Sequence, residues 1–381
     1  MTPRGTSRKL AAVSMFAGCG GLDLGAAQTG LVQTIWANDN DRWACETYRR
    51  NLGRHIVEGD ICEIEPPRAE CDLLLAGPPC QDFSTLWNHD GARTARGNLF
   101  REVARFLDVL QPVGFILENV PGLLSANRGA AWTIVRHALR APTAFLHNRP
   151  GPRYDVSAQI VDVADMGVPQ HRERLLVLGV RRDLGIRPPL IPAPTADCPR
   201  TVFDALDADP IAEHAPNHER GLDTPDVVER LKLIPPGKNY EVIPQGHPLA
   251  VKGLISHVYR RLEAGKPSYT VIANGGGGTH GYHHIEPRRL SNRERARLQT
   301  FPDDFVFYDG GPSAGRSAYP RVRRQIGNAV PPEAARLAVG ALAAALLNAG
   351  VQARGPRSLA KIRREALSLG LPIPAEATEA A

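Results

Sequence analysis

Short apolar runs alternate with amphipathic stretches over the first half of the chain. The runs predict buried β-strands at residues 9–16, 34–37, 55–57, 72–76 and 113–117. Two later runs, 154–163 and 174–180, predict a hairpin. Between the runs, residues 41–51 and 102–110 have the apolar spacing of helices. The alternation predicts an α/β fold with a Rossmann-like, doubly wound sheet that is mostly parallel.

The pattern changes after residue 184, where prolines cluster and the alternation of strands and helices is lost. Ser291 and Glu294 have the spacing of a capping box, which predicts a supporting helix over residues 289–299. We therefore predict two domains and a tail. They are a catalytic domain at 1–184 completed by 318–350, a smaller loop-rich domain at 185–317 that includes the supporting helix, and a C-terminal tail at 351–381 that we expect to be mobile.

The composition indicates which kind of partner the protein prefers and in which cellular compartment we expect it. The formal net charge of +6 and the isoelectric point of about 9.1 favour a polyanionic partner. The six cysteines form no CxxC pair and no zinc spacing, so we expect reduced thiols in the cytoplasm and no metal site. The N-terminal apolar run ends in a glycine turn, unlike a signal peptide. The alanine-rich stretch 334–347 is too short to span a bilayer and predicts a packed helix, so we expect no membrane partner.

A glycine turn follows the first predicted strand. The residues Phe16-Ala17-Gly18-Cys19-Gly20-Gly21 lead into a helix, and glycines at such a junction let the backbone approach a ligand closely. Their spacing differs from the G-x-G-x-x-G of dinucleotide sites. Asp39 lies 21 residues after Gly18, where an acid commonly binds ribose hydroxyls. Asp60 suits an adenine amino group or, equally, a turn. These residues favour a nucleoside-bearing cofactor.

A single cysteine stands just beyond the fourth predicted strand. Pro78 and Pro79 fix the backbone before Cys80, and the polar residues that follow argue against a core position for its thiol. Glu118 ends the fifth predicted strand, at the same edge of a parallel sheet. A buried carboxyl at that edge suits a proton donor. The pair therefore suggests a nucleophile with an acid beside it.

Arginines and polar loops supply candidate contacts to oxygen acceptors or phosphates. Arg172 and Arg174 lie two residues apart, so their side chains point the same way in an extended chain. In the loop-rich domain, Arg260 and the glycines that lead to His280 suit groove edges or phosphates, although four glycines also suit a flexible connector. The polar stretch 81–98 suits a loop that closes on nucleic acid.

Six motifs, in order between about Ala12 and Leu346, resemble those of the DNA cytosine-5 methyltransferase family, especially its bacterial modification enzymes. They are the glycine turn, Pro78-Pro79-Cys80-Gln81, Glu118-Asn119-Val120, Gln170-His171-Arg172-Glu173-Arg174, residues 289–305, and Gln325-Ile326-Gly327-Asn328. The resemblance implies a class I methyltransferase fold with S-adenosyl-L-methionine as methyl donor and no metal. It also implies that the loop-rich domain is a target-recognition domain for double-stranded DNA.

The resemblance further implies roles for individual residues. Cys80 would be the nucleophile, Glu118 would bind cytosine N3, Arg174 would contact O2, and Arg172 would support the site. The methyl-donor pocket would be lined by Phe16, Ala17, Gly18, Gly20, Asp39, Asp60, Ile61 and Asn328. DNA contacts are expected from Gln81, Ser84, Arg93, Arg260, Gly277 and His280. Asn40 departs from the family, whose members often place an apolar or aromatic residue there, against the adenine.

The implied reaction is methyl transfer to carbon-5 of a flipped-out cytosine in a specific duplex sequence, through a covalent bond between Cys80 and carbon-6. The implied role is protection of host DNA in a bacterial restriction–modification system, with a cognate restriction endonuclease as partner and a monomeric enzyme. Two alternatives stay open: a tRNA cytosine-5 methyltransferase, and a non-catalytic DNA-binding protein on the same scaffold. A nucleotide-dependent dehydrogenase fails on the glycine spacing and leaves Cys80 unexplained.

Overall fold

The computed structural model describes residues 8–79, 99–191, 199–221, 223–251, 257–275, 279–311 and 313–352. Some residues predicted for the site lie outside these ranges, namely Cys80, Gln81, Ser84, Arg93 and Gly277. The predicted C-terminal tail also lies outside them from residue 353 onward.

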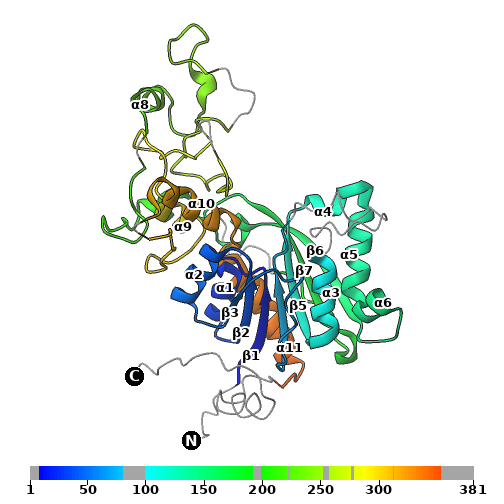
Figure 1. Ribbon diagram of the computed structural model, residues 1–381. Helices are drawn as coiled ribbons and strands as arrows, with labels where there is room; N and C mark the ends of the chain where they lie inside the picture. The colour runs from blue at the N-terminus through cyan, green and yellow to red at the C-terminus, as the bar shows by residue number, and fades with distance from the viewer. Residues whose placement is uncertain are drawn as a thin grey trace, which may run out of the picture.

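All seven predicted strands are present and form one sheet in the order β3-β2-β1-β4-β5-β7-β6 (Figure 1). They are β1 (Leu10–Met15), β2 (Val32–Asp39), β3 (Ile56–Glu58), β4 (Leu73–Ala76), β5 (Gly114–Asn119), β6 (Tyr154–Asp162) and β7 (Glu173–Arg181). The first five strands are parallel, whereas β7 runs antiparallel to β5 and forms the predicted hairpin with β6. Strand β2 is longer than predicted at both ends, because Val32 and Gln33 pair with β1 and its polar end, Asn38 and Asp39, still pairs with β3. The α/β prediction is confirmed.

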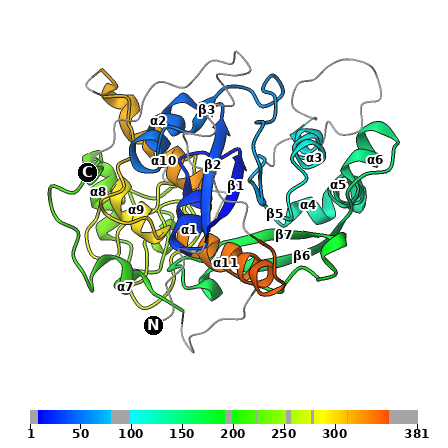
Figure 2. The ribbon, with the colours of Figure 1, turned by 90° about the horizontal axis from the view of Figure 1, so that it is seen from below.

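Helices cover both faces of the sheet. They are α1 (Gly21–Gln28), α2 (Arg42–Asn51), α3 (Leu99–Leu110), α4 (Gly122–Ser125), α5 (Ala130–Arg140), α6 (Pro142–His147) and α11 (Pro332–Asn348). Helix α10 (Ala318–Asn328) instead packs in a third core, which it shares with side chains from residues 202–307. Alternate side chains of β1 feed two cores: Leu10 and Ala12 pack with α1 and α11, whereas Val13 and Met15 pack with α3 and α5. Figure 2 shows the two sets of helices on opposite sides of the sheet. A sheet buried on both faces explains why its central strands are continuous apolar runs.

Most of residues 185–317, the loop-rich region, stand above the sheet in Figure 1 and contain few regular elements. The first residues of this range still belong to the sheet, since Ile186 and Ile191 pack against its core. Their α-helices in the described chain are α7 (Val202–Leu206), α8 (Pro225–Lys232) and α9 (Asn292–Leu298). The predicted capping box is confirmed, because the Ser291 hydroxyl accepts a hydrogen bond from Glu294 N and the Glu294 carboxylate accepts one from Ser291 N. Since Ser291 is the cap, α9 begins at Asn292, later than predicted.

The alanine-rich helix belongs to the core of the sheet region. The run Gly315–Asn348 is long and apolar enough to pass for a membrane span by length and composition. However, it comprises the separate helices α10 and α11, and 50% of its most apolar window is buried inside the protein. Ala338, Leu342 and Leu346 of α11 belong to the core that also contains α1 and the sheet. The prediction of a packed helix is therefore confirmed.

Candidate active site

A cavity of about 460 Å³ opens at the carboxyl ends of β1, β2, β4 and β5. It is lined by the glycine turn after β1, by residues 38–41 at the end of β2, by 77–79 after β4, and by 118–120 at the end of β5. The end of α10 adds Gly327 and Asn328. Ligands of open α/β sheets bind at this edge, so the position alone marks the cavity as the candidate site.

Most of the predicted site residues in the described chain line this one cavity. They are Phe16, Ala17, Gly18, Asp39, Asp60, Ile61, Glu118, Arg172, Arg174 and Asn328. Gly20 is an exception. It caps α1 with a φ of 94°, and a Cβ at this position would lie 2.3 Å from Leu52 Cδ1. Its contribution is therefore to the shape and packing of the turn.

Asp39 ties the glycine turn to the end of β2. Its Oδ2 accepts a hydrogen bond from Gly18 N at 2.8 Å, and its Oδ1 accepts one from Asp41 N at 2.8 Å. Burial raises the pKa of Asp39, and these two backbone N–H groups oppose the rise. Phe16 and Gly18 both have positive φ, of 55° and 56°. The carboxylate thus holds a turn whose backbone is exposed to the cavity.

Asp60 takes part in a turn, and its contact with an adenine amino group stays a prediction. Its Oδ1 accepts a hydrogen bond from Cys62 N at 3.0 Å, which closes a turn after β3. The same residue lines the cavity. Asn38 supports this turn from β2, since its side-chain amide donates to the carbonyls of Val57 and Gly59.

Glu118 and Arg174 form an ion pair across neighbouring strands. Arg174 Nε lies 2.8 Å from Glu118 Oε1, and the two side chains are only 16% and 13% exposed. Glu118 is opposite Leu176 in the β5–β7 register, which places Arg174 just beyond it along β7. Arg174 also donates to its neighbour's carbonyl, Glu173 O, at 2.7 Å. The sheet therefore presents a carboxylate and a guanidinium, side by side, to the cavity.

Arg172 joins the sheet to the loop-rich region and to α10. Its guanidinium donates to Val271 O, Gly327 O and Ala329 O, at 3.2, 2.9 and 3.3 Å. Burial, and secondly the nearby charge of Arg174, lower the pKa of Arg172 to about 9. Gly327 is required at this junction because a Cβ would lie 2.2 Å from Ala273 N. These contacts fix the loop-rich region against the edge of the cavity.

Two buried amides in the site were not singled out from the sequence. Asn119 donates from Nδ2 to Pro78 O at 3.0 Å and so holds the backbone two residues before Cys80. Gln325 accepts from Thr47 Oγ1 at 2.6 Å and donates to Tyr308 O at 2.9 Å. Both line the cavity. Both residues stand inside motifs, Glu-Asn-Val and Gln-Ile-Gly-Asn, and these positions could have indicated that they belong to the site.

Arg260 and His280, predicted as DNA contacts, lie elsewhere. Both line a separate cavity within the loop-rich region. Cys80 lies outside the described residues, although Pro78 and Pro79 before it line the larger cavity. Within the described ranges, no group of three or more His, Cys, Asp and Glu side chains comes together as a metal site.

A doubly wound sheet with a cavity at its carboxyl edge is typical of α/β enzymes that bind a nucleoside-containing ligand. A solved Escherichia coli prophage protein, titled a putative DNA modification methyltransferase, has the same fold with a TM-score of 0.68. It is 23% identical, and the match covers 89% of this chain and 100% of that one.

Sequence comparison gives the family. The Neisseria gonorrhoeae protein named Type II methyltransferase M.NgoFVII is 45% identical over 338 residues, covering 86% of this chain and 85% of that protein. The Brevibacillus brevis protein named Type II methyltransferase M.BbvI is 40% identical, covering 86% of this chain and 89% of that protein. The family model for C-5 cytosine-specific DNA methylases matches residues 10–343. The chain therefore belongs to this family of DNA (cytosine-5-)-methyltransferases.

Proposed function

We propose that the protein transfers a methyl group from S-adenosyl-L-methionine to carbon-5 of a cytosine in duplex DNA. The observation that carries this proposal is the shared cavity. It is lined at once by the glycine turn, by the Glu118–Arg174 pair, and by the two prolines that precede Cys80. A donor and a cytosine held there would meet at one sheet edge.

The cavity fits a sulfonium nucleoside. The positive-φ turn exposes backbone to a ligand, and Asp39 and Asp60 offer carboxylate acceptors for hydroxyl and amino groups. Asn328 offers an amide from α10. Asn40 also lines the cavity, so the face that relatives often cover with an apolar group is polar here. When bound, S-adenosyl-L-methionine supplies the methyl group.

The chemistry follows from the residue types. The Cys80 thiolate forms a bond to carbon-6 while Glu118 shares a proton with N3, and the electron pair of the 5,6 double bond makes carbon-5 nucleophilic. Arg174 binds O2 and stays paired with Glu118. After carbon-5 has accepted the methyl group, a base removes its proton and the double bond re-forms, which expels Cys80. Two easier steps replace one attack by an unactivated aromatic carbon.

The substrate we propose is double-stranded DNA. Carbon-6 is hidden within a duplex, so the cytosine must rotate out, at a cost of roughly a few kcal/mol. The net charge of +6 favours a polyanion, and the relatives are named Type II methyltransferases. We further propose that residues 185–317 form the target-recognition domain. The cellular role would be protection of host DNA in the bacterial cytoplasm, by a monomer that works beside a cognate restriction endonuclease.

Replacing the nucleophile tests the proposal. Cys80→Ser should bind duplex DNA as the wild type does and lose methyl transfer, because a serine hydroxyl is not ionised at neutral pH. Filter binding and transfer of radiolabelled methyl groups to duplex DNA measure the two properties, with bulk tRNA as the competing substrate. Cys62→Ser is the matched control, since this thiol does not line the cavity as the structure describes it. Normal turnover by Cys80→Ser would refute the covalent mechanism, and preferential transfer to tRNA would refute the DNA substrate.

A further inference from the structure

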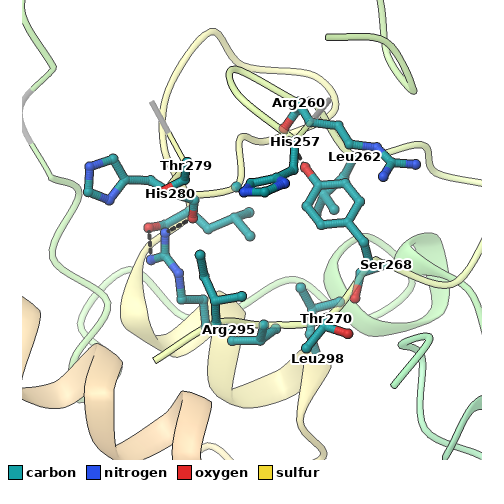
Figure 3. A pocket seen from close by; sticks show the side chains of 14 residues that line it. His257, Arg260, Leu262, Ser268, Thr270, Thr279, His280, Arg295 and Leu298 are labelled. Atoms are coloured by element: carbon teal, nitrogen blue, oxygen red, sulfur yellow. Dashed lines mark hydrogen bonds between the residues drawn. The ribbon is translucent and has the colours of Figure 1, made fainter. Parts of the chain in front are cut away.

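A second cavity, of about 240 Å³, lies within the loop-rich region (Figure 3). Its lining is mostly apolar and includes Leu262, Leu290 and Leu298. In the described chain it shares no lining residue with the cavity at the carboxyl ends of the strands. It lies below the roughly 300 Å³ at which sites for drug-sized ligands begin, so it suits one small ring system.

Ser268 gives this cavity an unused polar group. The residue is 2% exposed and lines the cavity, and its Oγ has no hydrogen-bond partner among the described residues. Its backbone is fixed on both sides, since Ser268 N donates to Pro169 O at 3.0 Å and Ser268 O accepts from His171 N at 2.7 Å. A buried hydroxyl without a partner costs free energy that a methyl group would not. The hydroxyl is therefore placed for a ligand rather than for the fold.

Aromatic groups provide stacking surfaces at the same place. The Tyr269 ring lines the cavity and is fixed, because its hydroxyl donates to Arg260 O and the Arg260 guanidinium lies 4.6 Å from the ring centroid. Figure 3 shows the His257 ring over the cavity and the Arg260 guanidinium directed away from it. Planar bases stack on such rings and arginine adds a cation–π contribution.

Positive charge without a counter-charge lies beside the cavity. Arg295, which lines it, is 2% exposed and donates to Leu290 O, Ser291 O, His280 O and Tyr319 Oη. Arg323 is 6% exposed and donates to His280 Nδ1 and Gly275 O. Neither guanidinium has a carboxylate partner in the part of the chain that the structure describes. Two uncompensated buried cations suit a polyanion passing over this surface.

We infer that this cavity binds one nucleobase of the duplex, other than the cytosine to be methylated, after that base has rotated out of the helix. The apolar lining and Tyr269 accept the faces of the base, the Ser268 hydroxyl pairs with its polar edge, and Arg295 and Arg323 attract the phosphates beside it. The inference rests on the proposed DNA substrate.

Ser268→Ala separates this role from a structural one. Removing an unpaired buried hydroxyl leaves the thermal midpoint of the free protein unchanged or higher. Affinity for the duplex should nevertheless fall roughly 3- to 10-fold, the worth of one hydrogen bond. Ser313→Ala, at an exposed serine outside the cavity, is the control and should alter neither value. Unchanged DNA affinity in Ser268→Ala would overturn the inference.

A base-deletion scan then identifies the base. Bisulfite sequencing maps the target, and duplexes lacking one base at each position are bound to the wild type and to Ser268→Val, whose methyl groups intrude on the cavity. One position apart from the methylated cytosine should show non-additive losses, and a fluorescent base analogue there should brighten on binding wild type only. Additive losses at every position, or no brightening, contradict the inference. A wild type that neither binds nor methylates DNA refutes the proposed function instead.

Discussion

The sheet region and the loop-rich region satisfy their backbone hydrogen-bonding groups in different ways. In the sheet, the strand ladders do so, as between β4 and its neighbours β1 and β5. In the loop-rich region, backbone turns satisfy part of these groups, and arginine side chains satisfy many of the remaining carbonyls. The Arg261 guanidinium donates to the five carbonyls of Leu231, Ile234, His283, His284 and Ile285. Arg293 likewise donates to Pro216 O, Pro302 O and Phe305 O.

The composition of the two regions explains the difference. Proline carries a carbonyl but no N–H, so a proline-rich segment has more acceptors than donors. Arginine carries five N–H donors and no acceptor, which corrects the imbalance. Arg261 and Arg293 are 6% and 0% exposed, so each is a buried hub. Arginine side chains therefore hold the loops of this region together from inside.

The largest effect is expected from a substitution that removes a reactive group of the sheet region and leaves the loop-rich region unchanged. Glu118→Gln keeps the shape of the side chain but removes the charge that pairs with Arg174 and the carboxyl that we propose binds cytosine N3. We expect kcat to fall by about 10²- to 10⁴-fold, the usual worth of an acid–base group. Binding of the donor and of DNA, followed by calorimetry, should change little. Weak donor binding with normal kcat would mean that Glu118 belongs to the donor pocket.

The next largest effect is expected from a substitution that destabilises the loop-rich region and leaves the sheet region unchanged. Arg261→Met keeps the length of the side chain but leaves five carbonyls without this donor. We expect a loss of about 3 kcal/mol or more in the free energy of unfolding, with faster proteolysis within 185–317. Donor binding should persist. Arg182→Met, at a half-exposed arginine paired with Asp155, is the control, with an expected change within about 0.5 kcal/mol. Equal urea midpoints for the two variants would contradict the claim that Arg261 holds the loop-rich region together.

A smaller effect tests the packing of the sheet region. A Cβ at Gly25 would lie 2.3 Å from Pro332 O and 2.5 Å from Ala335 Cβ, where α1 meets α11. Gly25→Ala should therefore destabilise the protein by about 1–3 kcal/mol. Gly340 on α11 has room, since its Cβ would meet only Thr29 Cγ2 at 3.7 Å. Gly340→Ala should stabilise by about 0.4–1 kcal/mol. If Gly25→Ala unfolds at the same temperature as Gly340→Ala or at a higher one, the contact between α1 and α11 does not limit the packing.

The sheet region was predictable because its signals are local. Strands buried on both faces are continuous apolar runs that can be recognised in the sequence. The carboxyl ends of parallel strands lie at the same edge of the sheet. These two signals placed Asp39 and Glu118 at one edge of the sheet, and both residues line one cavity there. The capping box at Ser291 is local as well.

The remaining features depend on partners that carry no sequence signal. Arg172 binds the carbonyls of Val271 and Gly327, and a backbone carbonyl is the same in every residue. The same holds for Asn119 and Pro78 O. In the loop-rich region, Arg261 and Arg293 also bind backbone carbonyls, so the sequence could indicate a change of character there but not which arginines hold the loops together.

Nucleoside analysis of the product tests the central claim most directly. Unmethylated duplex DNA is incubated with the purified protein and S-adenosyl-L-methionine that carries a deuterated methyl group, digested to nucleosides, and examined by mass spectrometry beside Cys80→Ser. The account predicts deuterated 5-methylcytosine from the wild type and none from the variant. Label in N4-methylcytosine or N6-methyladenine, or equal 5-methylcytosine from both proteins, would contradict it.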